Sequence, residues 1–204
     1  MAGKAHWEDV YTQKRPDEVS WFLETATQSL DLINAIAPQP SDAIIDVGGG
    51  ASRLVDALLA AGFSDLSILD LSAAALKAAQ DRLGDKASRV QWIEADITQI
   101  ELAPARYDIW HDRAVFHFMT TKEQRAAYKR NLTNALRPSG HVIIATFAEN
   151  GPEKCSGLPV QRYSVEALSA ELGPDFTLIK SCREAHRTPW GSVQEFIYCL
   201  FKRS

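Results

Sequence analysis

The sequence predicts a three-layer α/β sandwich with a mostly parallel seven-stranded sheet and an antiparallel last strand. Short apolar runs of strand length alternate with amphipathic helical stretches over residues 44–147. A glycine turn at 48–50 follows the first of these runs, as expected between a strand and a helix. The last two strand-like runs, 175–183 and 193–201, have no helix between them. Their connection contains proline and glycine, so they should pair as an antiparallel hairpin.

Two helices are expected before the first strand. The first is short and carries Trp7 and Tyr11 one turn apart. The second should begin at Pro16 and Asp17, because apolar residues recur at spacings of three and four over residues 19–37. One face of this second helix should pack against the rest of the domain.

From the glycine turn onward, strands and helices should alternate. Helices at about 52–61 and 72–83 each begin at a serine and end beside a glycine. A helix over 120–136 should begin with a capping box formed by Thr120 and Glu123. In order along the chain, strands are expected at 44–46, 66–69, 90–93, 107–110 and 141–147, followed by a loop at 148–163 and a helix at 164–172.

The composition is that of one folded domain. The chain has 204 residues, 46% of them hydrophobic, which suffices for a sizeable core. Its net charge of −4, with both signs interspersed, disfavours nucleic acid as a partner. No apolar run reaches the roughly 18 residues that span a bilayer. Residues 1–10 lack the apolar centre of a signal peptide, so we expect a cytoplasmic protein without a membrane partner. The oligomeric state is left open.

The three cysteines are Cys155, Cys182 and Cys199. Their number is odd and their spacing is not that of metal ligands, so neither a disulfide framework nor a metal site is expected. Cys182 and Cys199 lie in strand-like runs and should be small core residues.

Carboxylates end or follow three successive expected strands. Asp46 ends the first and precedes the glycine turn, Asp70 ends the second, and Asp96 follows the third. A glycine turn can lay peptide N–H groups against a ribose, phosphate or amino-acid group at a helix N-terminus. An acid about twenty residues after such a turn is typical of a ribose-binding position. We therefore expect a bound nucleotide at this edge of the sheet.

These motifs resemble those of the class I, seven-stranded S-adenosylmethionine-dependent methyltransferases, which have a Rossmann-like fold. The first motif matches Asp46, Gly48 and Gly50, although Ser52 stands where a third glycine is usual. The resemblance covers essentially the whole chain. In addition, the segments WEDVYTQKRPDEVSWF, HDRAVFHF, CSGLPVQRY and HRTPWGSVQEF are similar to a group of small bacterial methyltransferases of mostly undefined substrate.

The resemblance implies S-adenosylmethionine as cofactor and S-adenosylhomocysteine as its product. Asp70 should accept hydrogen bonds from the ribose hydroxyls and Asp96 one from the adenine amine, with Leu71 and Ile97 flanking the adenine ring. Aromatic faces attract cations, so N-terminal aromatic residues could surround the sulfonium or an apolar acceptor, or they could instead pack in the core. The remaining expected cofactor and aromatic residues are Asp46, Gly48, Gly49, Gly50, Tyr11 and Trp21, with Trp7 and Trp190 as further candidates.

A single domain with three functional parts follows from the same resemblance. Residues 1–40 should form a helical lid segment, 41–147 the cofactor-binding core, and 148–204 a substrate loop, a helix and the closing hairpin.

The acceptor should meet the cofactor at the carboxyl ends of the strands, where ligands bind in open parallel sheets. Asp112 and Arg113 could contact the methionine end or the acceptor, or instead form a structural pair. His117 could be a base or a packed core residue. Cys155, in a setting that could lower its thiol pKa, and His186, in a turn, could contact the acceptor or only bond their loops.

Several functions remain open at this stage. The favoured one is methyl transfer to a small molecule, with a protein side chain as the leading alternative acceptor. A nicotinamide-dependent oxidoreductase shares the first βαβ unit, and a cofactor-binding subunit without catalysis is a third possibility. The sequence lacks the Asn/Asp-Pro-Pro-aromatic motif of amino-group methyltransferases that act on DNA, glutamine or certain rRNA bases, so those substrates are disfavoured.

Overall fold

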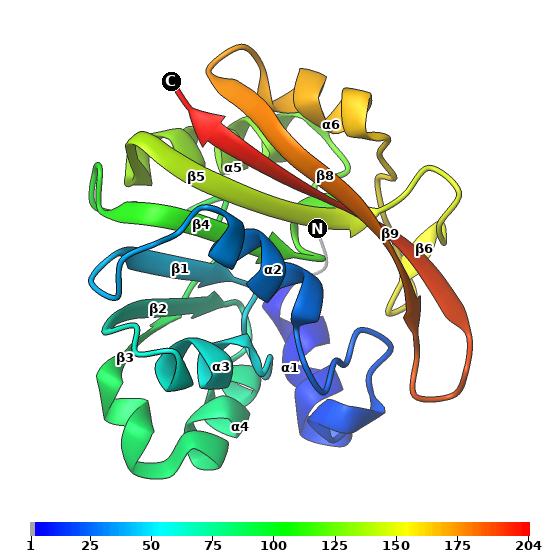
Figure 1. Cartoon of the computed structure of the whole chain (residues 1–204). Helices are drawn as coiled ribbons and strands as arrows, with labels where there is room; N and C mark the ends of the chain where they lie inside the picture. The colour runs from blue at the N-terminus through cyan, green and yellow to red at the C-terminus, as the bar shows by residue number, and fades with distance from the viewer. Residues whose placement is uncertain (1–2) are drawn as a thin grey trace.

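The computed structural model describes residues 3–204 and is built around a seven-stranded sheet (Figure 1). The strand order is β3-β2-β1-β4-β5-β9-β8. Neighbours from β3 to β5 run parallel, whereas β9 is antiparallel to both β5 and β8, which confirms the expected fold class. The strands of this sheet are β1 (Ala43–Val47), β2 (Asp65–Asp70), β3 (Val90–Glu94), β4 (Tyr107–Arg113), β5 (Leu136–Phe147), β8 (Phe176–Arg187) and β9 (Val193–Arg203).

Helices cover both faces of the sheet and complete the three layers. In Figure 1, α2 crosses the near face and α5 lies behind the sheet. The central strand β1 is buried along its whole length, as expected for a parallel strand covered on both faces. The helices are α1 (Lys4–Gln13), α2 (Thr27–Ala35), α3 (Leu54–Ala60), α4 (Ala73–Leu83), α5 (Lys122–Ala135) and α6 (Val165–Leu172), with short 3-10 turns η1 (Pro16–Glu18), η2 (Gly84–Arg89) and η3 (Phe116–Phe118).

The N-terminal segment differs from the sequence expectation. Helix α1 is present, but the helix expected to begin at Pro16 is only the short turn η1, and regular helix resumes at Thr27. Two backbone carbonyls in between, those of Ser20 and Trp21, accept hydrogen bonds from distant side chains. These tertiary hydrogen bonds hold the backbone outside a helix despite its helical periodicity.

The predicted serine cap is present at α4, whereas α3 begins two residues after Ser52 and has Arg53 at its N-cap. Ser72 caps α4 by accepting from the Ala75 N–H, and the Ser52 hydroxyl accepts from the Leu54 N–H at the start of α3. The capping box of α5 is shifted by one residue, because Thr121 and Gln124 form it in place of the expected pair.

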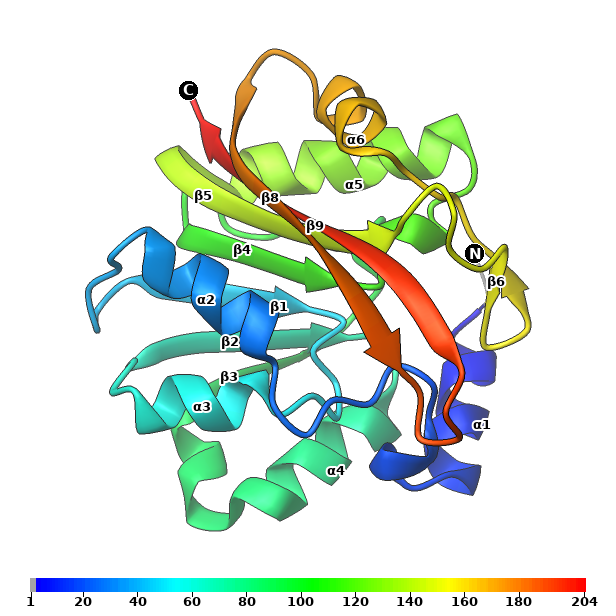
Figure 2. The same cartoon turned by 45° about the vertical axis from the view of Figure 1, so that its right-hand side comes forward.

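The C-terminal strands are longer than expected. Strands β8 and β9 pair from Phe176 opposite Arg203 at one end to Arg187 opposite Val193 at the other. His186 therefore lies within β8 and not in the connecting turn. The expected loop at 148–163 contains a small antiparallel hairpin of β6 (Lys154–Cys155) and β7 (Leu158–Pro159). Figures 1 and 2 both show the tip of the β8–β9 hairpin reaching the N-terminal segment.

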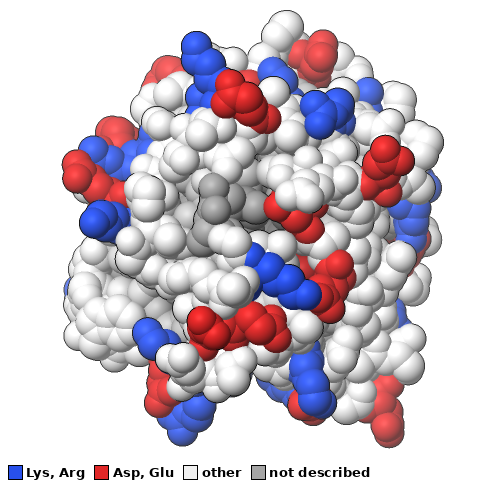
Figure 3. Space-filling view, turned by 180° about the vertical axis from the view of Figure 1, so that it is seen from behind, with Lys and Arg blue, Asp and Glu red and all other residues white. Residues whose placement is uncertain are grey.

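Charged side chains of both signs are interspersed on the face shown in Figure 3. Over residues 3–204, no helix has the length and apolar character needed to cross a membrane.

Candidate functional site

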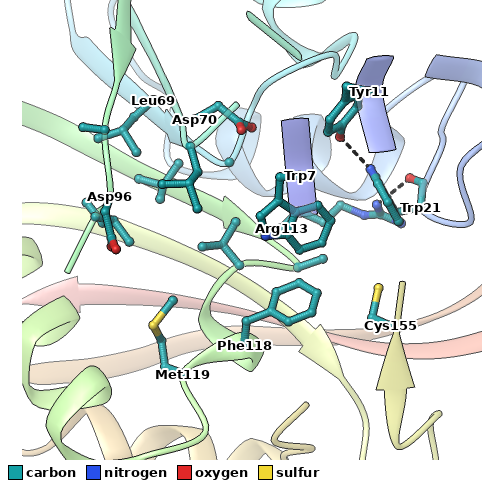
Figure 4. A pocket seen from close by; sticks show the side chains of 17 residues that line it. Trp7, Tyr11, Trp21, Leu69, Asp70, Asp96, Arg113, Phe118, Met119 and Cys155 are labelled. Atoms are coloured by element: carbon teal, nitrogen blue, oxygen red, sulfur yellow. Dashed lines mark hydrogen bonds between the residues drawn. The ribbon is translucent and has the colours of Figure 1, made fainter. Parts of the chain in front are cut away.

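A cavity of about 710 Å³, including its open mouth, lies at the carboxyl ends of the central strands. Figure 4 shows Asp70 and Asp96 on one side and Trp21 and Cys155 on the other. We call it the first cavity. Its lining residues come from the N-terminal segment, from the ends of β1 to β4 with the loops that follow them, and from the β6–β7 hairpin: Trp7, Tyr11, Trp21, Val47, Gly48, Leu69, Asp70, Leu71, Ala95, Asp96, Ile97, Arg113, Ala114, Val115, Phe118, Met119 and Cys155.

The glycine turn after β1 packs too closely for side chains. Gly48 has φ +71°, and a Cβ there would overlap the Val115 side chain. A Cβ at Gly50 would lie 2.5 Å from Asp70 Oδ2. The turn therefore brings bare backbone to the cavity and against the carboxylate at the end of β2, as a nucleotide cradle requires.

The two downstream acids occupy different surroundings. Asp70 is buried, and its Oδ1 accepts from the Ser72 N–H at 2.9 Å. Burial raises the pKa of this carboxyl to about 7. Asp96 is more exposed, and its Oδ1 accepts from the Thr98 N–H at 2.8 Å. Both acids line the first cavity together with Leu71 and Ile97, so the structure brings these four predicted residues together.

A second cavity of about 600 Å³ adjoins the first and shares Tyr11, Trp21, Gly48 and Arg113 with it. Its deep wall contains the buried set Asp46, His111 and Ser29. His111 Nδ1 lies 2.7 Å from Asp46 Oδ1, and His111 Nε2 lies 2.8 Å from Ser29 Oγ. The other Asp46 oxygen, Oδ2, is buried without a hydrogen-bond partner among the described residues.

His111 was not among the residues selected from the sequence. It pairs in register with Asp46 on the adjacent strand, so the two side chains point the same way. The available signal was its position two residues before Arg113, because residues two apart on a strand share a face.

The N-terminal segment forms the outer wall of both cavities. We call residues 4–26 the N-terminal cover. The Trp21 indole N–H donates to Tyr11 Oη at 3.0 Å, and the Trp7 ring meets Phe118 edge to face at 5.1 Å between centroids. Glu8 fastens α1 to the start of α4, because its carboxylate accepts from Ser72 Oγ at 2.8 Å.

Arg113 lies where the two cavities meet and joins three parts of the fold. Its Nε donates to Tyr198 Oη at 2.7 Å, and its Nη1 donates to the Trp21 carbonyl at 2.9 Å. Its Nη2 lies 3.5 Å from Glu184 Oε2, and its guanidinium carbon lies 4.6 Å from the centroid of the Phe196 ring. A largely buried guanidinium with several partners of this kind keeps a fixed position.

The structure does not bring Asp112 and His117 into either cavity. The Asp112 carboxylate is fully buried and accepts from Tyr128 Oη at 2.6 Å and from the Val115 N–H at 2.9 Å. Burial raises its pKa to about 6. The His117 ring is also buried, its Nδ1 accepts from the Phe147 N–H at 3.4 Å, and burial lowers its pKa to about 3. Both side chains therefore support the loop after β4 from beneath.

The structure places Cys155 in the first cavity and His186 outside both cavities. Cys155 lines the first cavity, but burial raises the pKa of its thiol to about 12, so the expected lowering of that pKa was wrong. His186 lines neither cavity; its Nε2 donates to the Ser20 carbonyl at 2.6 Å. It holds the N-terminal cover, because strand pairing continues past the position where a turn was expected.

Comparison with known families agrees with this site. Residues 44–140 match the family described as a methyltransferase domain. These residues, just under half of the chain, are thus similar to a methyltransferase domain. The match spans the glycine turn, Asp70, Asp96 and Arg113.

Curated relatives of this chain are distant. A Geobacillus protein described as an uncharacterized methyltransferase is 25% identical over 142 residues, covering 70% of this chain and 64% of the relative. The eEF1A lysine and N-terminal methyltransferase of Mus musculus is 22% identical over 138 residues, covering 68% of this chain but 19% of the relative. The chain thus spans about a fifth of the length of the mouse relative.

Solved methyltransferase structures share the whole fold. A structure from Burkholderia thailandensis, a 1,6-didemethyltoxoflavin-N1-methyltransferase with 1,6-didemethyltoxoflavin and S-adenosylhomocysteine bound, has a TM-score of 0.76 at 19% identity, covering 98% of this chain and 87% of that one. The N-methyltransferase NodS of Bradyrhizobium japonicum, solved with S-adenosylhomocysteine, has a TM-score of 0.71 at 15% identity, with coverages of 96% and 97%. The match of residues 44–140 agrees with the expected methyltransferase family, and the solved structures share the expected class I fold.

Proposed function

We propose that this chain binds S-adenosylmethionine across the two cavities and transfers its methyl group to a small-molecule acceptor. The observation that carries the proposal is the composition of the first cavity. Its inner side holds the acids at the ends of β2 and β3, and its outer side holds aromatic residues of the N-terminal cover. One enclosure therefore offers partners for an adenosine group and an apolar site for a second molecule.

The residues present fit the cofactor. Asp70 would accept from the ribose hydroxyls and Asp96 from the adenine amine, with Leu71 and Ile97 against the ring. The methionine portion would enter the second cavity, where the buried Asp46 Oδ2, which has no hydrogen-bond partner within residues 3–204, suits an ammonium group. When bound, S-adenosylmethionine supplies a methyl group on a positively charged sulfur.

In this proposal the aromatic residues of the N-terminal cover stabilise the positively charged sulfur and exclude water. Trp7, Tyr11 and Trp21 line the first cavity, and their ring faces favour a cationic sulfur over water at the reacting centre. They also exclude solvent from the acceptor. Orientation by such an enclosure can supply several kcal/mol of the barrier reduction without any proton transfer.

Apart from Asp70 and Asp96, which we assign to the adenosine portion of the cofactor, the first cavity does not present a good base at neutral pH. None of its described lining residues is a histidine, and burial raises the pKa of the Tyr11 hydroxyl and brings that of the Cys155 thiol to about 12. We therefore propose that the acceptor atom has a free lone pair at neutral pH, as a heteroaromatic or unprotonated amine nitrogen does, and that the enzyme acts by positioning.

A small acceptor is favoured by the enclosure. The cover lies over the first cavity and is fastened to the core through Glu8, Ser20 and Trp21. The Burkholderia thailandensis neighbour holds a small molecule beside S-adenosylhomocysteine, which supports the same class of acceptor here. A protein side chain is the second candidate, because two relatives are described as eEF1A lysine and N-terminal methyltransferases.

Two measurements test the proposal. Calorimetry should show binding of S-adenosylhomocysteine that weakens about tenfold or more in Asp70→Ala, which removes a charge-assisted hydrogen bond. Labelled S-adenosylmethionine added to a cell extract should label the small-molecule fraction. Label in a protein band would favour the second candidate. Preferential binding of a nicotinamide dinucleotide would contradict the cofactor, and binding without any turnover would favour a non-catalytic subunit.

A further inference from the structure

An open groove runs along the outer side of the N-terminal cover. It is bounded by α1, the β6–β7 hairpin and the tip of the β8–β9 hairpin. Its lining includes Asp9, Lys14, Trp21, Lys154, Cys155 and Trp190. Two of them, Trp21 and Cys155, also line the first cavity. These two side chains are therefore a shared wall between the groove and the site where we place the methyl donor.

The shared wall stands on the acceptor side of the first cavity. Figure 4 shows Trp21 and Cys155 opposite Asp70 and Asp96, the acids assigned to the adenosine portion. A molecule that approaches the sulfur from the side away from adenosine would come from the direction of this wall. The groove is the solvent-open space immediately beyond it.

The groove differs chemically from the first cavity. It presents two lysines, Lys14 and Lys154, against one carboxylate, Asp9. Both lysines are exposed, and neither forms an ion pair among residues 3–204. Trp190 is 62% exposed at the hairpin tip and offers a large ring surface. The groove thus suits the polar, anionic part of a ligand, whereas the first cavity suits an apolar part.

We propose that this groove binds the anionic, non-reacting end of the methyl acceptor, which is an aromatic molecule carrying a carboxylate or phosphate. Its aromatic head passes between Trp21 and Cys155 to the methyl donor, and its anionic end pairs with Lys14 and Lys154. The proposal rests on the proposed function and adds the chemical class of the acceptor.

Opening the shared wall requires the β6–β7 hairpin to move. Trp21 is held through its carbonyl by Arg113 and through its indole by Tyr11. Cys155 lies on the small hairpin, whose turn contacts α1 through a hydrogen bond of 3.2 Å between His6 Nε2 and Ser156 Oγ. Displacing this two-stranded hairpin disturbs less structure than displacing the bonded indole.

The test uses naphthylacetate as an aromatic anion and naphthylacetamide as its uncharged counterpart. Both are titrated by calorimetry or ligand-observed NMR into the full chain saturated with S-adenosylhomocysteine. The protein variants are Lys14→Gln/Lys154→Gln and, as a matched control, Lys86→Gln, an exposed lysine in η2 at the opposite edge of the sheet.

Wild-type protein should bind the anion more tightly than the amide. The double variant should bind the anion about fivefold more weakly, since two exposed ion pairs are lost, with the affinity for the amide and for S-adenosylhomocysteine unchanged. Lys86→Gln should match wild type. The proposal is overturned if the anion does not bind at millimolar concentration, binds no better than the amide, is unaffected by the double variant, or displaces S-adenosylhomocysteine. Failure of S-adenosylhomocysteine itself to bind would overturn the proposed function instead.

Discussion

The imidazole of His186 donates a hydrogen bond through Nε2 to the Ser20 carbonyl at 2.6 Å, across 166 positions of sequence. The next carbonyl along the chain, that of Trp21, accepts from Arg113. Two consecutive peptide units of the N-terminal cover are thus held by side chains from β8 and β4. The cover, the cofactor strands and the closing hairpin therefore form one connected unit around the two cavities.

Replacing His186 should loosen the N-terminal cover. His186→Ala leaves the Ser20 carbonyl without this donor, and we expect a loss of about 1–3 kcal/mol in the free energy of unfolding, measured with urea. Methyl transfer should fall as well, because Trp21 follows Ser20 directly. Arg187→Ala removes an exposed side chain of the same strand and should leave both properties unchanged. Equal unfolding curves for both variants would rule out the His186 contact as a support.

The stability of the ligand-free protein should respond to pH through Asp70. Its pKa is raised to about 7 in the folded state, against about 3.9 in an unfolded chain. The folded state therefore binds more protons between these values, and the contribution of this group to stability falls as pH rises from about 4 to about 7.

Asp70→Asn removes this titration and should stabilise the ligand-free protein more at pH 8 than at pH 5. The gain at pH 8 should be on the order of 2–4 kcal/mol. Thermal unfolding at the two pH values measures the difference. The same variant should bind S-adenosylhomocysteine more weakly. A stability gain that does not depend on pH would contradict a raised pKa for the buried Asp70 carboxyl.

The pair of Asp46 and His111 should contribute more to stability than its neighbour Ser29. His111→Ala leaves a buried carboxylate without its partner, and we expect a loss of about 3–5 kcal/mol. Ser29→Ala removes one hydrogen bond and should cost about 1 kcal/mol. Adding Asp46→Asn to His111→Ala should recover part of the loss, since it neutralises the stranded charge. Chemical denaturation of the variants would show whether the order holds; equal losses for His111→Ala and Ser29→Ala would refute it.

The three cysteines should react at different rates with iodoacetamide. Cys155 and Cys199 are buried, and burial raises the pKa of each thiol to about 12. Cys182 is partly exposed. Because the thiolate is the reactive form, native protein at pH 8 should be alkylated first at Cys182, as peptide mass spectrometry would show. Early modification of Cys155 would mean that its loop opens in solution.

Removing residues 1–16 should leave the domain folded but reduce its activity. The deleted part includes α1 with Trp7 and Tyr11, but none of the sheet. We expect the circular dichroism spectrum of a folded α/β domain, together with weaker cofactor binding and strongly reduced methyl transfer, because water enters the cavities. Unchanged turnover in the shortened chain would limit the cover to a structural role.

The order of strands and helices, the antiparallel closing hairpin and the acids at the ends of β1 to β3 could all be predicted from the sequence. These features depend on local periodicity, glycine turns and helix caps, each of which is formed by residues that are close together in the sequence. The pocket positions of Asp70, Leu71, Asp96 and Ile97 followed, because the carboxyl ends of parallel strands meet at one edge of a sheet.

The tertiary structure alone decided which side chains of the loops face the site. Asp112 and Arg113 are neighbours on β4 and point to opposite faces, so one supports the loop from below and the other lies between the cavities. The sequence shows that side chains alternate along the strand, but it does not show which of the two alternating sets faces the cofactor. The thiol pKa of Cys155 and the irregular backbone at Ser20 likewise depend on burial and on partners far along the chain, which local patterns do not encode.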